Sequence, residues 1–323
     1  MRILSGIQSS GELHIGNYFG ALRQHVELQD QGESVYFIAD YHSMTSVRDG
    51  PLRRDLVIEV ALDYLACGLD PARAILYRQS DLPEVCELSW ILGSVTPMGL
   101  LERGHAYKDK VAQGLSADHG LFAYPILMAA DILLYNPDIV PVGRDQKQHV
   151  EMARDIAQRF NHVYEAEVFK LPEPRILESV AVIPGTDGRK MSKSYDNAIR
   201  MFWADKKIKK AVMGIVTDST PVEEPKDTQT PLFEIWSLFA SPADREQEFA
   251  RAEAGGVGYG EVKKDLLARL LDYFADMRAR RADLEGRLDD VEDILVDGAV
   301  RARALAQPVL DACRSAAGLR ARG

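Results

Sequence analysis

Three short, mostly apolar segments, each separated from the next by a helical pattern, limit this chain to few folds. They are residues 2–7, 35–39 and 74–77. Apolar runs that do not alternate with polar residues are typical of parallel strands buried on both faces. A helical pattern covers residues 15–28, and Pro51 can open a second helix at its first turn. Strands that alternate with helices predict right-handed crossovers and an α/β fold with a doubly wound parallel sheet.

The last third of the chain has a different pattern. From about Asp205 onward no strand pattern remains, and helical periodicity is evident over residues 262–284 and 291–317. We therefore expect an all-helical C-terminal domain. The glycine-rich segment 255–260 does not fit GxGxxG and follows no predicted strand, so it is interpreted as a turn between helices.

Composition excludes several classes of protein. With 323 residues, 46% of them hydrophobic, the chain can bury a full core, and a net charge of -10 argues against a general polyanion binder. The three cysteines form no CxxC pair, so neither a zinc site nor an iron–sulfur cluster is expected. The N-terminus has no signal-peptide pattern and no apolar run could span a bilayer, which predicts a cytoplasmic protein without a membrane partner.

Two short motifs predict an ATP site that lacks a P-loop. Ligands of doubly wound sheets bind beyond the carboxyl ends of the strands, which places residues 8–17, 40–45 and 141–146 around one crevice. His14-Ile15-Gly16-Asn17 lies in the first of these, and Lys190-Met191-Ser192-Lys193-Ser194 follows roughly 175 residues later. The free N–H groups of a helix start and two lysines on a loop can hold a polyphosphate from two sides. Lysines flanking Met and Ser also occur in solvated loops, so KMSKS is informative only beside its partner.

The motifs, taken together, resemble those of the bacterial tryptophanyl-tRNA synthetases, a family of class I aminoacyl-tRNA synthetases. The segments that carry the resemblance are SGIQSSG at 5–11, HIGN at 14–17 with GALR at 20–23, YPILMAADILLY at 124–135, DIVPVGRDQKQHVEMARDIAQRFN at 138–161 and KMSKS at 190–194. The resemblance covers essentially the whole chain. It implies activation of L-tryptophan with ATP and Mg²⁺, transfer to the tRNA for tryptophan, and a homodimer. It also implies a Rossmann-like catalytic domain over residues 1–195 and a helical anticodon-binding domain over 196–323, whose last helix can pack back on the first.

The resemblance assigns roles residue by residue. It implies catalytic roles for His14, Asn17, Lys110, Lys190 and Lys193. The residues that match ATP contacts of the family are Gln8, Ser9, Ser10, Gly16, Asn17, Gly143, Arg144, Asp145, Val182, Lys190, Met191, Ser192, Lys193 and Ser194. The residues that match the surroundings of the amino acid are Leu4, Gly6, Gln8, His42, Tyr124, Met128, Asp131, Val140, Val142 and Gln146. Asp131 matches the carboxylate that accepts the indole N–H.

Three positions depart from the usual family pattern. The common QPSG is Gln8-Ser9-Ser10-Gly11 here, Arg144 stands where a glutamate is frequent, and Leu4 stands where some members have an aromatic residue. Backbone contacts to phosphates survive such changes better than side-chain contacts do. No inserted editing domain is evident, which fits a substrate that can be distinguished at the first site.

Other interpretations stay open at this point. A tyrosyl-tRNA synthetase, a non-catalytic relative that only binds, and a nucleotidyltransferase for small molecules share parts of the pattern. Without the resemblance, His42 and His149 would be read as buried or supporting histidines and not as metal ligands. The basic runs at 206–210 and 278–281 are either solvated helix faces or contacts to RNA phosphates.

Overall fold

The computed structural model describes residues 1–104, 107–108, 112, 118–143, 146–176 and 182–320. The chain forms two compact units. Unit 1 comprises Met1–Ser10, Gln24–Glu178 and Arg287–Gly323, and unit 2 comprises Gly11–Arg23 and Ser179–Gly286. The chain therefore crosses between the units several times instead of once near residue 195. The roles assigned above to residues 1–195 and 196–323 stay a prediction.

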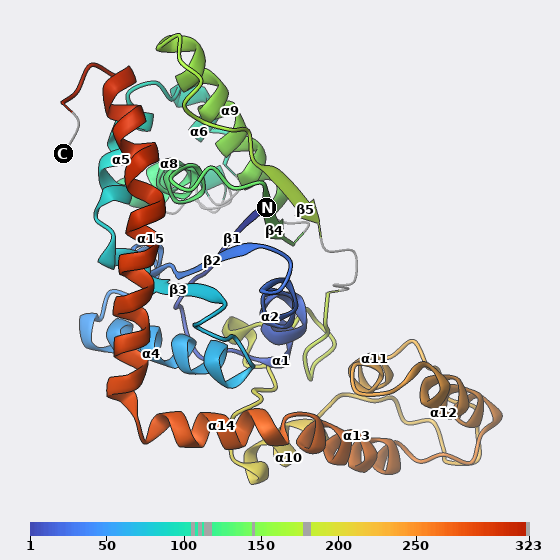
Figure 1. Cartoon of the computed structure of the whole chain (residues 1–323). Coiled ribbons are helices and arrows are strands. Elements are labelled where there is room, and N and C mark those ends of the chain that lie inside the picture. The colour runs from blue at the N-terminus through green and yellow to red at the C-terminus, as the bar shows by residue number, and fades with distance from the viewer. Residues whose placement is uncertain (105–106, 109–111, 113–117, 144–145, 177–181, 321–323) are drawn as a thin grey trace. The chain divides into compact units, whose positions relative to one another are not determined.

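Unit 1 is built on a parallel sheet of five strands in the order β3-β2-β1-β4-β5 (Figure 1). This order confirms the predicted doubly wound α/β fold. The strands are β1 (Arg2–Ile7), β2 (Glu33–Ile38), β3 (Ala74–Arg78), β4 (Ile139–Val142) and β5 (Glu173–Ile176). The first three match the apolar segments identified in the sequence.

The sequence does not predict strand β5, because its residues Glu173–Ile176 include Pro174 and form no apolar run. A proline cannot donate to a sheet ladder, yet it is tolerated on an edge strand, where one side of the strand has no partner. β5 is such an edge, since it pairs only with β4 in the strand order. Pairing partners that are distant in sequence, rather than local propensity, define this strand.

Helices cover both faces of the sheet. Successive residues of β2 point to opposite faces, and both faces are buried. Tyr36 stacks on His25, which belongs to α2 (Arg23–Leu28), and on Tyr64, which belongs to α4 (Gly50–Ala66). Val35 and Phe37 point the other way, into the main hydrophobic core. A strand buried on both sides has no polar face, which is why the apolar runs do not alternate.

The start of α4 confirms the expected helix at Pro51. Asp49 caps the helix by accepting a hydrogen bond from the backbone N–H of Leu52 at 2.9 Å, and Pro51 occupies the first turn. The helix stops before Gly68, whose φ of 104° favours glycine.

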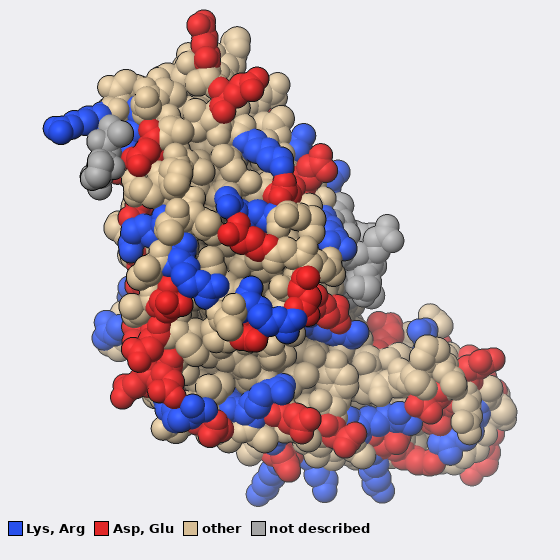
Figure 2. All heavy atoms as spheres, in the orientation of Figure 1, with Lys and Arg blue, Asp and Glu red and all other residues tan. Residues whose placement is uncertain are grey.

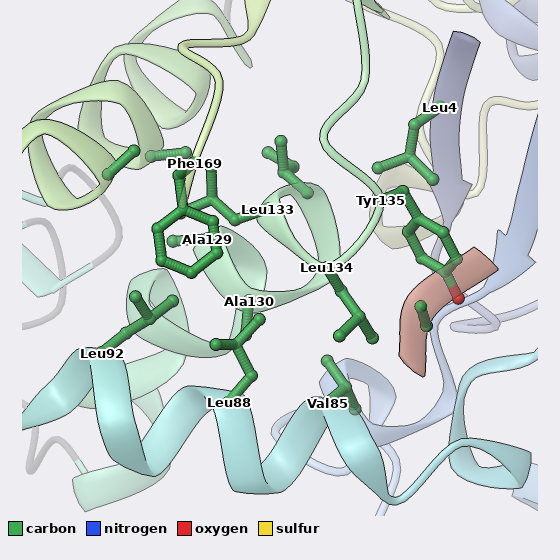
Figure 3. Close-up of a cluster of buried hydrophobic side chains, with 14 of the residues drawn as sticks. Leu4, Val85, Leu88, Leu92, Ala129, Ala130, Leu133, Leu134, Tyr135 and Phe169 are labelled. Carbon is green, nitrogen blue, oxygen red and sulfur yellow. The ribbon is translucent and has the colours of Figure 1, made fainter. Parts of the chain in front are cut away.

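The main core lies between the sheet and three further helices. They are α5 (Glu84–Gly93), α8 (His119–Leu133) and α9 (Lys147–Val163). In Figure 3, Val85, Leu88 and Leu92 of α5 point toward α8, where Ala129 and Ala130 leave room for them. Small residues facing large ones let the two helices pack closely.

The last helix, α15 (Leu288–Ala316), belongs to unit 1 and packs against β3 (Figure 1). Gly298 makes the close approach possible, because a Cβ at this position would lie 1.9 Å from the carbonyl oxygen of Leu76. Arginines of the helix bind the same unit: Arg301 donates to the carbonyl of Pro71 at 2.6 Å, and Arg303 donates to Glu84 at 2.6 Å. The C-terminal helix is thus part of the sheet's own packing.

Unit 2 is mainly helical and also contains the two short motifs. Its helices are α1 (Ile15–Asn17), α10 (Asp205–Met213), α11 (Pro231–Ser237), α12 (Pro242–Ala254), α13 (Tyr259–Tyr273) and α14 (Ala275–Glu285). The glycine-rich segment is the expected turn, since it lies between α12 and α13 and Gly255 and Gly256 have φ values of 85° and 90°. The helical periodicity over residues 262–284 is confirmed as two helices, α13 and α14, which meet at Phe274, whose buried ring packs on other aromatic residues.

Within the described part of the chain, no helix is both long and apolar enough to cross a membrane.

The contact at Gly298 gives a stability test. Gly298→Ala should lower the free energy of unfolding by about 1–3 kcal/mol, because the new methyl group must displace the backbone of β3, and this outweighs the roughly 1 kcal/mol that alanine gains in a helix. Gly260→Ala in α13 is the matched control, since nothing lies within 4 Å of a Cβ built there. Thermal unfolding of both variants measures the difference, and an unchanged melting temperature for Gly298→Ala would refute the close packing.

Candidate active site

Polar residues follow the strands of unit 1 at the carboxyl edge of the sheet. Gln8 follows β1, His42 lies in α3 (Asp40–Ser43) just after β2, Gln79 follows β3 and Gly143 follows β4. Gln8 joins two of these segments, since its Nε2 donates to the carbonyl of His42 at 3.2 Å. The strand order reverses between β1 and β4, which is where sheets of this type bind ligands.

Asp131 is a buried carboxylate on α8 that reaches this edge. Its side chain is 1% exposed, and it accepts hydrogen bonds from Gln79 Nε2 at 2.7 and 2.8 Å and from His42 Nε2 at 2.8 Å. Burial raises the pKa of Asp131, while the hydrogen bonds from His42 and Gln79 act in the opposite direction. A carboxylate has about four acceptor positions, so three accepted bonds leave one on Oδ1.

Gln79 is a site residue that the sequence reasoning missed. It is 1% exposed, and its Oε1 accepts from the backbone N–H of Tyr41 at 3.0 Å, which fixes Nε2 as the group facing Asp131. Its position directly after a buried parallel strand was the available signal. A neutral amide holds the carboxylate in place and adds no charge of its own.

A pocket of about 420 Å³ opens beside these residues within unit 1. His42 and Tyr124, two of the predicted amino-acid contacts, line it together with Tyr41, Leu121 and Leu127. Most of the lining residues are aromatic or aliphatic, and the charged pair Arg48 and Asp118 also borders the pocket. Such a lining suits a large, flat apolar ligand oriented by one or two hydrogen bonds.

His149 connects Tyr124 to Gln146, another of the predicted amino-acid contacts. Its Nε2 lies 2.8 Å from the hydroxyl of Tyr124, and its Nδ1 lies 2.5 Å from Oε1 of Gln146. This agrees with the interpretation of His149 as a supporting residue. The bond to an amide oxygen requires a proton on Nδ1, so a neutral ring accepts from Tyr124 through Nε2.

The remaining predicted amino-acid contacts differ in exposure. Leu4 and Val140 are buried in the main core, and Met128 and Val142 pack against it partly exposed. Gly6 has a packing reason to be glycine, because a Cβ there would lie 2.4 Å from the ring of Phe37.

The nucleotide contacts predicted in the turn after β1 have different environments. Gln8 and Ser10 are exposed, whereas Ser9 is fully buried and its hydroxyl has no hydrogen-bond partner among the described residues. The predicted nucleotide segment therefore contains a buried hydroxyl whose hydrogen bonding is unsatisfied among the described residues.

The HIGN motif forms a capped helix start in unit 2. His14 is the N-cap of α1: its Nδ1 accepts from the N–H of Asn17 at 3.3 Å, and Oδ1 of Asn17 accepts from the N–H of His14 at 3.1 Å. Burial lowers the pKa of His14 to about 4, and the nearby charges of Lys193 and Arg200 contribute. His14 is therefore neutral at physiological pH and presents Nε2–H as a donor.

The KMSKS segment lies in the same unit as HIGN. Lys193 Nζ donates to the carbonyl of Gly11 at 2.6 Å, and Gly16 lies near the sulfur of Met191, with a Cβ built there 3.6 Å away. Lys190 and Ser194 are exposed, and Ser192 caps the short turn Lys193–Tyr195 by accepting from the N–H of Ser194 at 3.3 Å. The structure thus brings the two motifs together, as the sequence predicted.

Three predicted residues, Lys110, Arg144 and Asp145, lie outside the described residues. Val182, predicted near the nucleotide, is 62% exposed. Among the described residues, no three His, Cys, Asp or Glu side chains are grouped so that they could hold a metal ion.

The lowered pKa of His14 predicts a loss of stability in acid. The folded state releases the proton at about pH 4 and the unfolded state at about 6.5, so this stabilisation is complete above pH 6.5 and is lost as the pH falls toward 4. At pH 5 the loss is about 2 kcal/mol. His14→Asn keeps a capping group without a titration, so it should lose less stability than the wild type between pH 7 and pH 5. Denaturant unfolding at both pH values measures this, and an identical pH dependence would contradict the lowered pKa.

Comparison with known proteins agrees with this geometry. The family model of class I tRNA synthetases (W and Y) matches residues 1–275. A tryptophan–tRNA ligase of Rhodopirellula baltica is 55% identical over 99% of this chain and 100% of its own length, and one of Fusobacterium nucleatum is 52% identical over 98% of each. The crystal structure of a Campylobacter jejuni tryptophanyl-tRNA synthetase, complexed with ADP and tryptophan, superposes with a TM-score of 0.91. It is 49% identical and covers 99% of this chain and 100% of that one.

These matches extend over both units and confirm the resemblance seen in the motifs. The chain belongs to the class I tRNA synthetase family of the tryptophan and tyrosine enzymes.

Proposed function

We propose that this chain activates L-tryptophan with ATP, forming tryptophanyl-adenylate and pyrophosphate, and then transfers tryptophan to the tRNA for tryptophan. The names of the relatives at 55% and 52% identity over nearly the whole chain support this function. The observation that carries the choice of amino acid is Asp131, a buried carboxylate beside a largely apolar pocket, with one acceptor position left.

The indole ring fits the chemistry of this part of unit 1. The ring is large and apolar and has a single N–H donor, which Oδ1 of Asp131 would accept. His42 and Gln79 hold the carboxylate in place, and Tyr124 presents an aromatic wall. A pocket of this kind distinguishes a ligand with the donor from one without it, because a missing donor leaves a buried charge without its partner.

The motifs of unit 2 would bind the triphosphate. The capped start of α1 would offer the N–H group of Gly16, and neutral His14 would offer a hydrogen-bond donor. Lys190 and Lys193 would place positive charge on the phosphates that leave. Mg²⁺ would accompany ATP with phosphate oxygens as its main ligands and would lower the charge of the leaving group.

Activation joins the tryptophan carboxylate to the α-phosphorus of ATP. A carboxylate oxygen forms the new P–O bond, the bond to the bridging oxygen of the β-phosphate breaks, and pyrophosphate carries the electron pair away. The protein would contribute position and charge stabilisation instead of a covalent intermediate. In the second step, a terminal ribose hydroxyl of the tRNA would attack the activated carbonyl, and AMP would leave.

Lysines of α10 are the candidates for contact with the tRNA backbone. Lys206, Lys207, Lys209 and Lys210 are exposed, and Lys207 Nζ lies 3.9 Å from the centre of the Trp203 ring. Figure 2 shows Lys and Arg side chains projecting from the part of unit 2 where Figure 1 places α10 and α13. Exposed cations of this kind bind phosphates without reading sequence.

Two arginines of the second basic run have structural partners instead. Arg278 donates to the carbonyls of Met201 and Trp203 at 2.9 and 2.7 Å. Arg281 is buried and stacks 4.9 Å from the ring centre of Phe202. We therefore propose α10, and not these residues of α14, as the phosphate contact.

A second copy of the chain is the proposed partner of an exposed apolar surface on unit 1. Trp90 of α5 is 81% exposed, and Met98, which opens α6 (Met98–Leu101), is 62% exposed. The two helices follow one another in the chain, and large exposed apolar side chains are frequent at subunit interfaces. A homodimer in the cytoplasm is the assembly that we propose.

Lys193 tests the assignment of the phosphate site. In tryptophan-dependent ATP–pyrophosphate exchange, Lys193→Ala should lower kcat by a factor that corresponds to about 2–4 kcal/mol and leave the KM for tryptophan nearly unchanged, because leaving-group charge develops in the transition state. Lys264→Ala removes an exposed cation elsewhere in unit 2 and is the control. Exchange that requires tyrosine instead of tryptophan, or none with the wild type, would overturn the proposed function. A Lys193 variant altered only in KM would overturn the role of this lysine.

Asp131 tests the selectivity for indole. Asp131→Ala should reduce kcat/KM for tryptophan by roughly 10- to 150-fold, since a charge-assisted hydrogen bond contributes about 1.5–3 kcal/mol. A benzothiophene analogue has the same shape without the N–H, so the mutation should affect it much less. Both substrates on both proteins form a cycle whose interaction term isolates the N–H contact. Equal losses for the two substrates would make Asp131 a structural residue only.

A further inference from the structure

Asn197 lies three residues beyond KMSKS and is buried, with 2% of its surface exposed. All the polar atoms of its side chain are bonded to the preceding loop. Nδ2 donates to Oδ1 of Asp187 at 2.6 Å and to the carbonyl of Lys190 at 3.1 Å, and Oδ1 accepts from the N–H of Ser192 at 2.8 Å. These partners fix the orientation of the amide, since a carboxylate and a carbonyl need a donor and an N–H needs an acceptor.

The loop around Asn197 is a closed hairpin held by backbone hydrogen bonds. Pro184 and Lys190 form an antiparallel bridge, and the N–H of Met191 donates to the carbonyl of Ile183 at 2.9 Å. Glycine is required at position 185 for the side-chain amide of Asn197 to fit, because a Cβ at Gly185 would lie 2.2 Å from Nδ2 of Asn197. Asn197 therefore fills the inside of the hairpin and touches both of its arms.

The bonded positions coincide with the residues that the proposed function uses. The carbonyl of Lys190 and the N–H of Ser192 flank Met191, whose side chain is buried, and Lys193 follows directly. With these two backbone groups fixed, the directions in which Lys190 and Lys193 leave the loop are also fixed. A displacement of about 1 Å in such a site can cost about 100-fold in rate.

Resting on the proposed function, we propose that Asn197 is a positioning residue that holds the KMSKS loop, and with it Lys190 and Lys193, in the geometry needed to neutralise the leaving pyrophosphate. It does not touch the substrate in this assignment. The hydrogen bond from Asn197 also lowers the pKa of Asp187, with a contribution from Arg189, so Asp187 is a stable acceptor at neutral pH.

The first test is Asn197→Asp, which keeps the shape and the acceptor for Ser192 but places a carboxylate against Asp187 and the Lys190 carbonyl. In tryptophan-dependent ATP–pyrophosphate exchange, kcat should fall by about 10- to 100-fold with little change in the KM for tryptophan. Amide exchange of residues 185–195, measured without any nucleotide, should become faster in this variant.

The pair with Asp187 supplies a rescue experiment. Asp187→Asn alone should stay near wild-type activity, because an asparagine oxygen still accepts from Asn197. The double variant Asp187→Asn with Asn197→Asp reverses donor and acceptor, so it should recover part of the kcat lost in the single Asn197→Asp variant. A general loss of folding would give no such recovery.

Asn161 is the matched control. Like Asn197, its side chain makes three hydrogen bonds, but all three are to the backbone and lie in unit 1: Nδ2 donates to the carbonyl of Phe169 at 2.8 Å, and Oδ1 accepts from the N–H groups of Val168 and Phe169 at 3.1 and 3.0 Å. Asn161→Asp should lower thermal stability and leave kcat unchanged.

The outcomes separate this inference from the proposed function. Wild-type kcat in Asn197→Asp, an equal loss in Asn161→Asp, or no recovery in the double variant would each overturn the positioning role. Absence of exchange activity in the wild type would overturn the proposed function instead. In that case, the nucleotide-free amide exchange would still decide whether Asn197 holds the loop.

Discussion

A parallel sheet buried on both faces can present polar side chains only where its strands end, and unit 1 is organised by this constraint. Helices α4 and α8 cover opposite faces, so Tyr36 and Val35 are both buried although they point in opposite directions. The backbone groups that leave the sheet at its carboxyl edge must find other partners. Gln79 meets this need, since its side chain binds the N–H of Tyr41 on one side and Asp131 on the other. The site thus arises where the regular hydrogen bonding of the sheet stops.

In unit 2, side chains close in sequence bond the backbone groups that helices and strands leave without partners. The start of α1 is closed by His14 and Asn17, and the hairpin before residue 195 is closed by Asn197. In each case a neutral side chain satisfies backbone groups, and the lysines are left on the outside of the loop. Neutral groups are suited to this task, because a buried charge would have to be desolvated and would add its own attraction or repulsion to that of the lysines.

The sequence predicted the parallel sheet and the pairing of the two motifs because both depend on local patterns. Apolar runs such as residues 35–39 indicate burial on both faces, and the glycine and histidine of HIGN mark a helix start. Strand β5 and the break at Phe274 could not be predicted, because a distant pairing partner determines the first and an aromatic cluster the second. The position of Gln79 after β3 marks it as a candidate site residue, but its partner could not be predicted, because Asp131 lies 52 residues away in the chain.

The arrangement around Asp131 explains how one carboxylate can select a ligand without destabilising the fold. An unpaired carboxylate in a buried site is strongly unfavourable, whereas a positive partner such as arginine would occupy the acceptor positions in a bidentate pair. Gln79 and His42 give the third option, in which three hydrogen bonds support the charge and one acceptor position is left on Oδ1. One acceptor position of the carboxylate is therefore left, and under the proposed function the indole N–H would fill it. Selectivity would then follow from the cost of leaving that position empty when the ligand has no donor.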